Sequence, residues 1–432
     1  MATPFWYNAA LALIKPLYQS RIRKRASDAE QLQQELTERF GPFQPPKNLH
    51  AIWFHVVSVG ETNAAQPLIE HYLKLGHPVL VTNTTKTGQA RAKSLFLKAP
   101  YLDLFQAVYL PADQKALIRD FYQQYQPKLL LLMETELWPN LLDQAPQFNV
   151  PSVLLNARLS EKSARGYAKV KGLTRGMLQQ LSQLLAQDSA TQQRYIQLGI
   201  AAEKTQVLGN IKFDITAPER FIQQADQLKQ EWQLAARKII TLASTHALEE
   251  KDILGALKPA LDADPDLVCI VVPRHPERFD EVFQAAQRLN LTTQRRSSGQ
   301  RIERDTQVYL ADSMGEMWLW YGLSQACYVG GSLNEPGGGH NILEPIALNV
   351  PTVLGKNYFN FQTIVDEFVD AQAVEIVDNF KQAAETLLEL LNHSEKAESL
   401  NAAAQKIMQL NTGSLEKHIQ VIDQYLQKNQ SS

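Results

Sequence analysis

Residues 328–345 read YVGGSLNEPGGGHNILEP, and this stretch decides the fold more than any other part of the chain. A short apolar strand over 326–329 leads into a loop rich in glycine, and a helix is predicted over 341–348. The glycines are Gly330, Gly331, Gly337, Gly338 and Gly339. Glycine lets a main chain approach a ligand where a Cβ would clash, and a helix N-terminus attracts phosphate. The pattern therefore predicts a nucleotide site, although a flexible surface loop also fits it.

Strand and helix patterns alternate through the first half of the chain. Strands are predicted at 51–59, 78–83, 106–110, 128–133, 152–156, 184–187 and 206–208, and helices at 61–75, 89–98 and 114–125. Continuous apolar strands separated by helices are typical of a parallel sheet that is covered on both faces.

The second half repeats this scheme. Strands are predicted at 238–243, 267–272, 307–310, 326–329 and 352–354, and helices at 248–261, 278–289, 315–323 and 341–348. Neither half has G-x-G-x-x-G after its first strand, which argues against a nicotinamide or flavin enzyme.

Length and charge limit the possible classes of protein. A chain of 432 residues is too long for one core, so we predict an N-terminal domain at 28–216 and a C-terminal domain at 217–380, with helices at 381–432 bracing both. The net charge of −2 gives no support to nucleic-acid binding. Cys269 and Cys327 lie in apolar strand-like runs, which favours buried, reduced thiols over a disulfide or a metal site.

The N-terminus differs from the rest of the chain. Residues 5–18 are mostly apolar and short of the roughly 20 residues that span a bilayer, and basic residues follow at once. These are Arg21, Arg23, Lys24 and Arg25. We therefore predict that residues 1–27 form a membrane-associated helix with a basic flank. No small-residue cleavage site follows the apolar run, so we do not expect a signal peptide that is removed. The alternative is a helix packed on a partner or on the protein itself.

Carboxylates follow two of the predicted strands. In parallel sheets ligands sit at the carboxyl ends of strands, so polar residues there are candidates for a site. Glu61 follows the first strand in the first turn of a helix, where the dipole is expected to lower its pKa, and it can accept a proton from an attacking hydroxyl. An ordinary first-turn Glu is the alternative. Glu134 follows the apolar run 128–133 as a second candidate, while Glu136 could merely cap the next turn.

Basic residues follow other strands. Lys212 can neutralise developing charge, with a solvated Lys as the alternative. Arg274 is held between prolines at the end of strand 267–272 and offers a rigid fork for phosphate, unless it pairs with Asp280. His246 and His340 have helix-cap alternatives of equal weight.

Seven segments, in this order, resemble the 3-deoxy-D-manno-oct-2-ulosonic acid (Kdo) transferases of lipopolysaccharide synthesis. They are SVGE (58–61), METELWP (133–139), NARLS (156–160), GNIKFD (209–214), PRHPER (273–278), GEM (315–317) and GGHNILEP (338–345). The resemblance implies an α/β GT-B glycosyltransferase fold, in which two Rossmann-like doubly wound domains face each other across a cleft. The N-terminal domain would take the acceptor and the C-terminal domain the nucleotide sugar.

The resemblance also implies roles for individual residues. Glu61 matches the catalytic base, and Glu134 and Lys212 match residues that stabilise the transition state. Positions that contact cytidine monophosphate (CMP) match Pro273, Arg274, Gly315, Glu316, Met317, Asn341, Ile342, Leu343 and Glu344. One departure from the family pattern is visible at 334–336, where three residues lengthen the loop and leave its backbone contacts open.

The implied reaction is an inverting transfer of Kdo from CMP-Kdo to the lipid A precursor lipid IVA, at the cytoplasmic side of the inner membrane. Arg274, Lys212 and the N-terminus of helix 341–348 would hold the departing phosphate without a metal ion or other cofactor. Two rival hypotheses are a GT-B enzyme that uses a uridine diphosphate (UDP) sugar and a sugar-nucleotide binding protein without catalysis.

Overall fold

The computed structural model describes residues 3–25 and 28–428. The chain forms two compact units, the first comprising Met1–Asp214 with Asn411–Ser432 and the second Ile215–Leu410. The helical region predicted at 381–432 is thus divided between the units. Residues 1–2, 26–27 and 429–432 of the predicted segments lie outside the described residues.

A seven-stranded sheet forms the centre of the first unit, with the order β3-β2-β1-β4-β5-β6-β7. All of its strand pairs are parallel. The strands are β1 Ile52–His55, β2 Val79–Asn83, β3 Phe105–Tyr109, β4 Leu129–Met133, β5 Ser152–Ala157, β6 Gln183–Ala186 and β7 Thr205–Val207. Every residue of β4 is buried because both faces of the sheet are covered, which accounts for its continuous apolar sequence.

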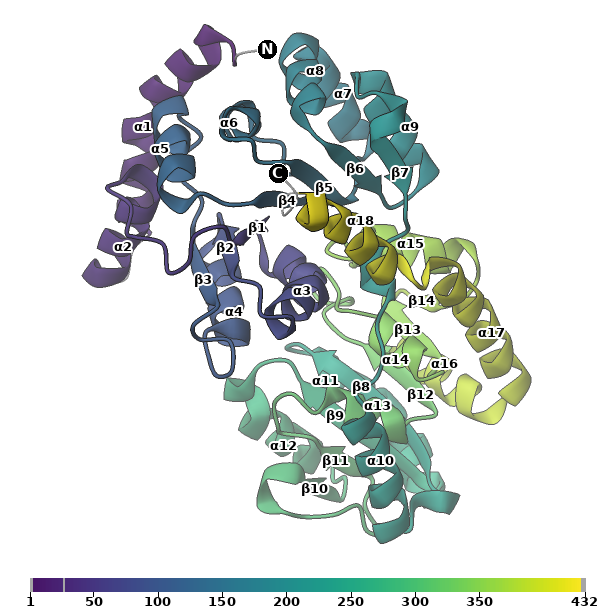
Figure 1. Cartoon of the computed structure of the whole chain (residues 1–432). Helices are drawn as coiled ribbons and strands as arrows, with labels where there is room; N and C mark the ends of the chain where they lie inside the picture. Colours follow the sequence, from purple (N-terminus) through teal and green to yellow (C-terminus); the bar gives the residue numbers. More distant parts are fainter. Residues whose placement is uncertain (1–2, 26–27, 429–432) are drawn as a thin grey trace. The chain divides into compact units, whose positions relative to one another are not determined.

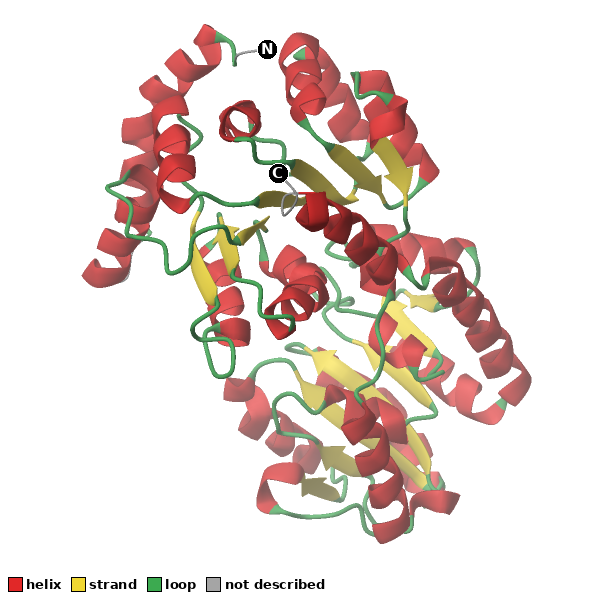
Figure 2. Cartoon of the chain, viewed as in Figure 1, coloured by secondary structure: helices red, strands yellow, loops and turns green. Residues whose placement is uncertain are grey.

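Helices cover both faces of this sheet (Figure 2). The unit contains α1 Phe5–Lys24, α2 Ala29–Phe40, α3 Val59–Lys74, α4 Lys86–Phe96, α5 Lys115–Tyr125, α6 Pro139–Gln144, α7 Glu161–Lys169, α8 Lys171–Gln180, α9 Ser189–Leu198 and α18 Ser414–Lys428. One face packs on α5, α6, α8 and α9, and alternate strand residues pack the other face on α3, α4 and α18. Successive residues of each strand thus point to opposite faces of the sheet, as expected of β-structure.

The last helix, α18, belongs to the first unit although it is far away in sequence (yellow in Figure 1). The carboxylate of Asp214 accepts hydrogen bonds from the backbone N–H groups of Gly413 (2.6 Å) and Leu415 (2.5 Å) at the start of the helix. The buried His418 accepts the backbone N–H of Asn156 at 3.2 Å, and burial lowers its pKa to about 4. The helix is therefore fixed to the end of β5 by polar as well as apolar contacts.

A second seven-stranded parallel sheet forms the centre of the other unit, with the order β10-β11-β9-β8-β12-β13-β14. Its strands are β8 Lys238–Thr245, β9 Leu267–Pro273, β10 Thr293–Arg295, β11 Val308–Leu310, β12 Ala326–Val329, β13 Thr352–Gly355 and β14 Glu375–Val377. Cys269 and Cys327 lie in two of these strands as free, buried thiols, so that prediction is confirmed.

The helices of the second unit again cover both faces. They are α10 Glu219–Glu231, α11 Glu249–Ala263, α12 Phe279–Arg288, α13 Met317–Leu323, α14 Leu343–Ala347, α15 Gln362–Asp370, α16 Phe380–Asn392 and α17 Ser394–Asn411. One face packs on α11, α12 and α16, and the other on α10 and α13. Both units thus have the doubly wound α/β architecture that the alternating pattern predicted.

The N-terminal helix α1 packs on the first unit on one side only. Ile22 is fully buried, and the hydroxyl of Tyr7 donates to Asp113 at 2.9 Å. On its outer side Phe5, Leu13 and Leu17 are 87%, 81% and 71% exposed. None of the helices within 3–25 and 28–428 is long and apolar enough to cross a bilayer.

Candidate active site

The site of the first unit is built where its strand order reverses. β1 pairs with β2 on one side and with β4 on the other. The connection after β1 therefore runs toward β2, whereas the connection after the adjacent β4 runs the opposite way, toward β5. Open α/β sheets bind ligands at the carboxyl ends of strands at such a point. Glu61 follows β1 and Glu134 follows β4 directly, and both carboxylates therefore belong to this edge.

Glu61 lies in the first turn of α3, where Ser58 is the N-cap. Its carboxylate accepts the backbone N–H of Val57 at 2.9 Å and the hydroxyl of Ser58 at 3.1 Å. The hydroxyl oxygen of Ser58 in turn accepts the backbone N–H of Glu61 at 3.3 Å, which is one of the two bonds of an S-x-x-E capping box, so the first-turn role that the sequence left open is real.

The pKa of Glu61 nevertheless rises to about 8. Burial is the largest cause, and the nearby charges of Glu136 and Glu134 add to it, while the hydrogen bonds from Val57 and Ser58 oppose the rise. The expected lowering by the helix dipole is therefore wrong, because loss of hydration outweighs the local field. A carboxyl group with a pKa this close to neutral has the strength that general-base catalysis needs.

Glu134 and Lys212, predicted independently, are brought together. The Nζ atom of Lys212 lies 2.6 Å from Oε1 of Glu134, and both side chains are mostly buried at 26% and 15% exposure. Glu134 has a φ of +55°, which turns the chain sharply after β4. The solvated-Lys alternative does not describe this residue.

Glu136 has a local partner. Its Oε2 atom accepts the indole N–H of Trp138 at 2.9 Å and lies 3.7 Å from Nε2 of the fully buried His55. Through its charge it raises the pKa of Glu61. Glu136 is thus part of the electrostatic environment of Glu61 and does not cap a helix.

The second unit has a corresponding edge, where β8 lies between β9 and β12. Its loops are organised by Glu249, which is fully buried at the start of α11. Five donors reach this carboxylate. They are the backbone N–H groups of His246 (2.8 Å), Gly331 (2.9 Å), Ser332 (3.2 Å) and Leu333 (3.2 Å) and the hydroxyl of Tyr328 (2.8 Å).

Sequence reasoning missed Glu249. In the sequence it stands in the acidic run EEKD, which is typical of a solvated first helical turn. The signal that could have identified it is the glycine loop itself, because a loop with so many free N–H groups needs a buried acceptor.

At two positions of this loop a glycine is required because a Cβ would clash with neighbouring atoms of the protein itself. A Cβ on Gly330 would lie 2.7 Å from Cα of Thr245, and one on Gly338, where φ is +128°, would overlap the side chain of Asn360. The pattern correctly predicted a close approach of bare main chain. At these two positions the neighbours are the end of β8 and the residue Asn360 of the same unit.

Three histidines gather at the same edge. The Nε2 atoms of His246 and His340 are 2.8 Å apart with stacked rings, and the ring of His275 packs edge-on against His246. Burial, followed by the charges of His246 and Arg274, lowers the pKa of His340 to about 4. Neither His246 nor His340 caps a helix, because Leu248 and Ile342 hold those positions.

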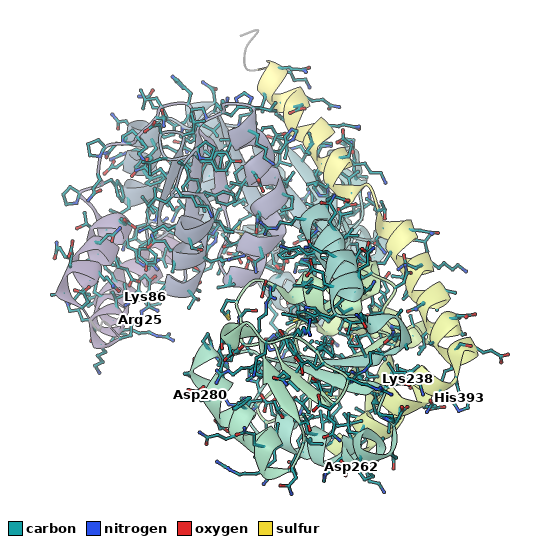
Figure 3. The ribbon with its side chains drawn as sticks, turned by 90° about the horizontal axis from the view of Figure 1, so that it is seen from below. Arg25, Lys86, Lys238, Asp262, Asp280 and His393 are labelled. Carbon is teal, nitrogen blue, oxygen red and sulfur yellow. The ribbon has the colours of Figure 1, made fainter. Side chains whose placement is uncertain are left out.

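Arg274 follows Pro273, the last residue of β9, and its side chain is exposed. The suggested partner Asp280, labelled in Figure 3, instead pairs with Arg295 at 2.8 Å. Among residues 3–25 and 28–428 the guanidinium of Arg274 has no hydrogen bond or ion pair. It is therefore available to an anionic ligand.

The predicted helices at 315–323 and 341–348 begin later than expected. Gly315 precedes α13 with a φ of +82°, and Glu316 is the residue before Met317. Burial would raise the pKa of Glu316, but hydrogen bonds from Arg296 and Ser313 hold it below its usual range.

The helix α14 has only five residues and starts at Leu343, after Asn341 and Ile342. The side-chain oxygen of Asn341 accepts the N–H of Leu343 at 3.1 Å, and its amide donates to Glu344 at 3.3 Å. Burial raises the pKa of Glu344. The predicted helix 341–348 is therefore too long, and Asn341 already occupies one of the free N–H groups of the single turn that forms. The phosphate site at this N-terminus stays a prediction.

No group of three or more His, Cys, Asp or Glu in the described ranges 3–25 and 28–428 is arranged to hold a metal ion. The metal-free reaction stays a prediction.

Comparison with known proteins gives a consistent assignment. The family model of the 3-deoxy-D-manno-octulosonic-acid transferases (kdotransferases) matches residues 34–215. The 3-deoxy-D-manno-octulosonic acid transferase of Haemophilus influenzae is 37% identical over 434 residues, covering 98% of this chain and 99% of that protein.

Two solved structures are also similar. The C-terminal CMP-Kdo binding domain of WaaA from Acinetobacter baumannii is 63% identical with a TM-score of 0.44, covering 44% of this chain and all of that domain. A glycosyltransferase from Rickettsia africae is 14% identical with a TM-score of 0.53 and covers 88% of this chain and 99% of that one. At this low sequence identity, the similarity to the Rickettsia africae protein shows a shared fold only.

Proposed function

The chain belongs to the 3-deoxy-D-manno-octulosonic acid transferase family, and on that premise we propose that it transfers Kdo from CMP-Kdo to the lipid A precursor lipid IVA with inversion at the anomeric carbon. The single observation that carries the mechanism is the half-buried carboxyl group of Glu61, with its pKa near 8, at the carboxyl end of a central strand.

The base role of Glu61 follows from proton affinity. A primary sugar hydroxyl of the acceptor gives its proton to the Glu61 carboxylate as its oxygen bonds to the anomeric carbon of Kdo. The bond from that carbon to the phosphate oxygen breaks, and CMP leaves with the electron pair. A carboxylate whose pKa is about 8 takes a proton more readily than an ordinary one and is still partly ionised at neutral pH. One base and one displacement invert the configuration.

We assign a supporting role to Glu134 and Lys212. Their 2.6 Å ion pair holds the ammonium group at the carboxyl-end edge of the first sheet. There Lys212 can offset negative charge that develops during the displacement, and Glu134 fixes its position.

We assign the nucleotide to the second unit. Arg274 has an exposed guanidinium without a hydrogen-bond partner among the described residues 3–25 and 28–428, which suits a phosphate. Glu344 can accept hydrogen bonds from the ribose hydroxyls, and the loop 315–317 can offer backbone groups to the base. Because α14 is a single turn, Arg274 carries more of the phosphate binding than the sequence pattern implied.

We further propose that the protein acts at the cytoplasmic face of the inner membrane, with α1 lying in the interface. Exposed Phe5, Leu13 and Leu17 would enter the lipid, while Arg21 and Arg23 would meet anionic head groups. Tyr7 and Ile22 tie the other side of α1 to the first unit, so the helix need not leave the protein to reach the lipid.

Calorimetry with CMP and UDP tests the donor half of this proposal. Tighter binding of CMP by wild type, lost in Arg274→Ala, is the expected result. Preference for UDP would favour a glycosyltransferase or epimerase that uses UDP sugars. Normal CMP binding without transfer to any acceptor would favour the binding protein without catalysis.

A further inference from the structure

The first unit contains a cavity of about 260 Å³ between α1, the end of α2 and the loops that follow β2, β3 and β4. We call it the α1 pocket, and its main apolar walls are Leu11, Ile14, Tyr18, Phe40, Leu110 and Trp138. Figure 1 shows α1 in purple beside α2. The pocket opens at the same sheet edge that carries Glu61, because the carboxyl ends of parallel strands lie together.

Two charged side chains that line the pocket, Arg39 and Asp113, are already satisfied inside the protein. The guanidinium of Arg39 donates to Glu35 at 2.9 Å and to the carbonyl of Thr84 at 2.6 Å. The carboxylate of Asp113 accepts the Tyr7 hydroxyl at 2.9 Å and two backbone N–H groups of α6. A ligand therefore finds few free donors or acceptors there, and the pocket suits hydrocarbon better than a sugar or a nucleotide.

One cation remains available at the pocket. Lys15 lines it and lies over the ring of Phe40 at 5.5 Å, and it has no carboxylate partner within the described residues 3–25 and 28–428. Every charged residue of α1 is basic. An amphiphile with an anionic head group and an apolar tail matches this combination.

Two short routes connect the pocket to Glu61. Trp138, in the pocket wall, donates its indole N–H to Glu136, whose charge raises the pKa of Glu61. Thr84, which also lines the pocket, precedes Thr85, whose hydroxyl donates to the carbonyl of Val57, and the N–H of Val57 donates to the Glu61 carboxylate.

We propose that the α1 pocket holds one acyl chain of the acceptor whose hydroxyl is deprotonated by Glu61. The inference rests on the proposed function and adds the subsite that recognises the lipid part of the acceptor. An engineered cavity of about 150 Å³ accepts benzene, so about 260 Å³ corresponds to about ten chain carbons. Burial of each methylene strengthens binding by about fourfold, the equivalent of about 0.8 kcal/mol.

A series of n-alkyl phosphates with two to fourteen carbons tests the pocket directly. Calorimetry below the critical micelle concentration is expected to give affinities that rise by about fourfold per methylene and level off near ten carbons. Ala112 lines the pocket, and Ala112→Phe should move the plateau to about four carbons by filling the space with a ring. Leu11→Phe serves as a second filling variant, and a melting transition of the first unit equal to that of wild type shows that each variant is folded.

Leu13→Ala is the matched control on the same helix, because Leu13 is exposed and does not line the pocket. It should leave the alkyl phosphate series unchanged and weaken binding to anionic vesicles. Affinities that climb past ten carbons without a plateau, and equally in Ala112→Phe, would mean adsorption on the outer side of α1 and overturn the proposal.

Transfer kinetics identify the occupant. Ala112→Phe should raise the KM for lipid IVA by about tenfold or more, with kcat unchanged, and leave the KM for fully deacylated acceptor as in wild type. An unchanged KM for lipid IVA together with a shortened plateau would assign the pocket to bilayer lipid and overturn the acceptor assignment. Absence of transfer by wild type would instead refute the proposed function, while the alkyl phosphate series would still report on the pocket.

Discussion

Replacing Glu61 by Gln should stabilise the protein at alkaline pH while it abolishes transfer. Gln keeps the shape of the protonated carboxyl group and can still accept the N–H of Val57, which now lies 2.9 Å from the carboxylate. It cannot ionise. The variant therefore removes the loss of stability that arises when a buried carboxyl group must give up its proton.

The magnitude follows from the pKa of Glu61. The folded protein holds the proton up to a pKa of about 8, whereas the unfolded chain releases it near 4.5. The folded state thus binds more protons between these values, and stability falls as the pH rises through this window. At 1.36 kcal/mol per pH unit the full effect is about 5 kcal/mol, and partial solvent access reduces it to about 2–5 kcal/mol.

Thermal unfolding at a series of pH values measures this effect. At pH 5 wild type and Glu61→Gln should melt together, because Glu61 is protonated in the folded state. At pH 9 the transition of the first unit in the variant should be higher by on the order of 10 °C. In wild type kcat/KM should rise with pH up to about 8, as the base ionises. A difference in melting temperature that does not change with pH would refute the reasoning.

Three further substitutions test other parts of the site. Lys212→Met removes the cation that is 2.6 Å from Glu134, and kcat should fall by about 10²–10³ with CMP affinity unchanged; an equal loss of CMP affinity would contradict the assignment. Arg274→Ala should weaken CMP binding by about 10–100-fold, the equivalent of about 1.5–3 kcal/mol, since one charged hydrogen-bond donor is lost; an unaltered Kd would exclude it from the phosphate site. Glu249→Gln replaces a carboxylate that accepts five hydrogen bonds. It should destabilise the second unit by about 3 kcal/mol or more and weaken CMP binding. A melting temperature equal to that of wild type would show that the loop does not depend on Glu249.

The sheets could be predicted because burial on both faces leaves a direct trace in the sequence. The run 128–133 contains β4, Leu129–Met133, with all five residues buried. The edge strands β10 and β14 were missed, since each has three residues and neither is fully buried. Short edge strands depend on their neighbours and carry little pattern of their own.

The site was predictable as far as it depends on strand ends. Glu134 and Lys212 are 78 residues apart, yet both follow strands, and the fold brings them into contact. The pKa of Glu61 was predicted in the wrong direction, because the helix dipole is local whereas desolvation and two neighbouring carboxylates are tertiary effects. The pairing of His246 with His340, 94 residues away, leaves no trace in the sequence at all.

The central claim is that this chain transfers Kdo with Glu61 as the base. Its most direct test is to incubate the protein with Kdo, a CMP-Kdo-forming enzyme and lipid IVA, and to weigh the lipid product by mass spectrometry. Wild type should increase the mass of lipid IVA by one or more Kdo residues, and Glu61→Gln, with CMP affinity equal to that of wild type, should leave the mass unchanged. The same mass increase in Glu61→Gln, at a comparable rate, would contradict the account.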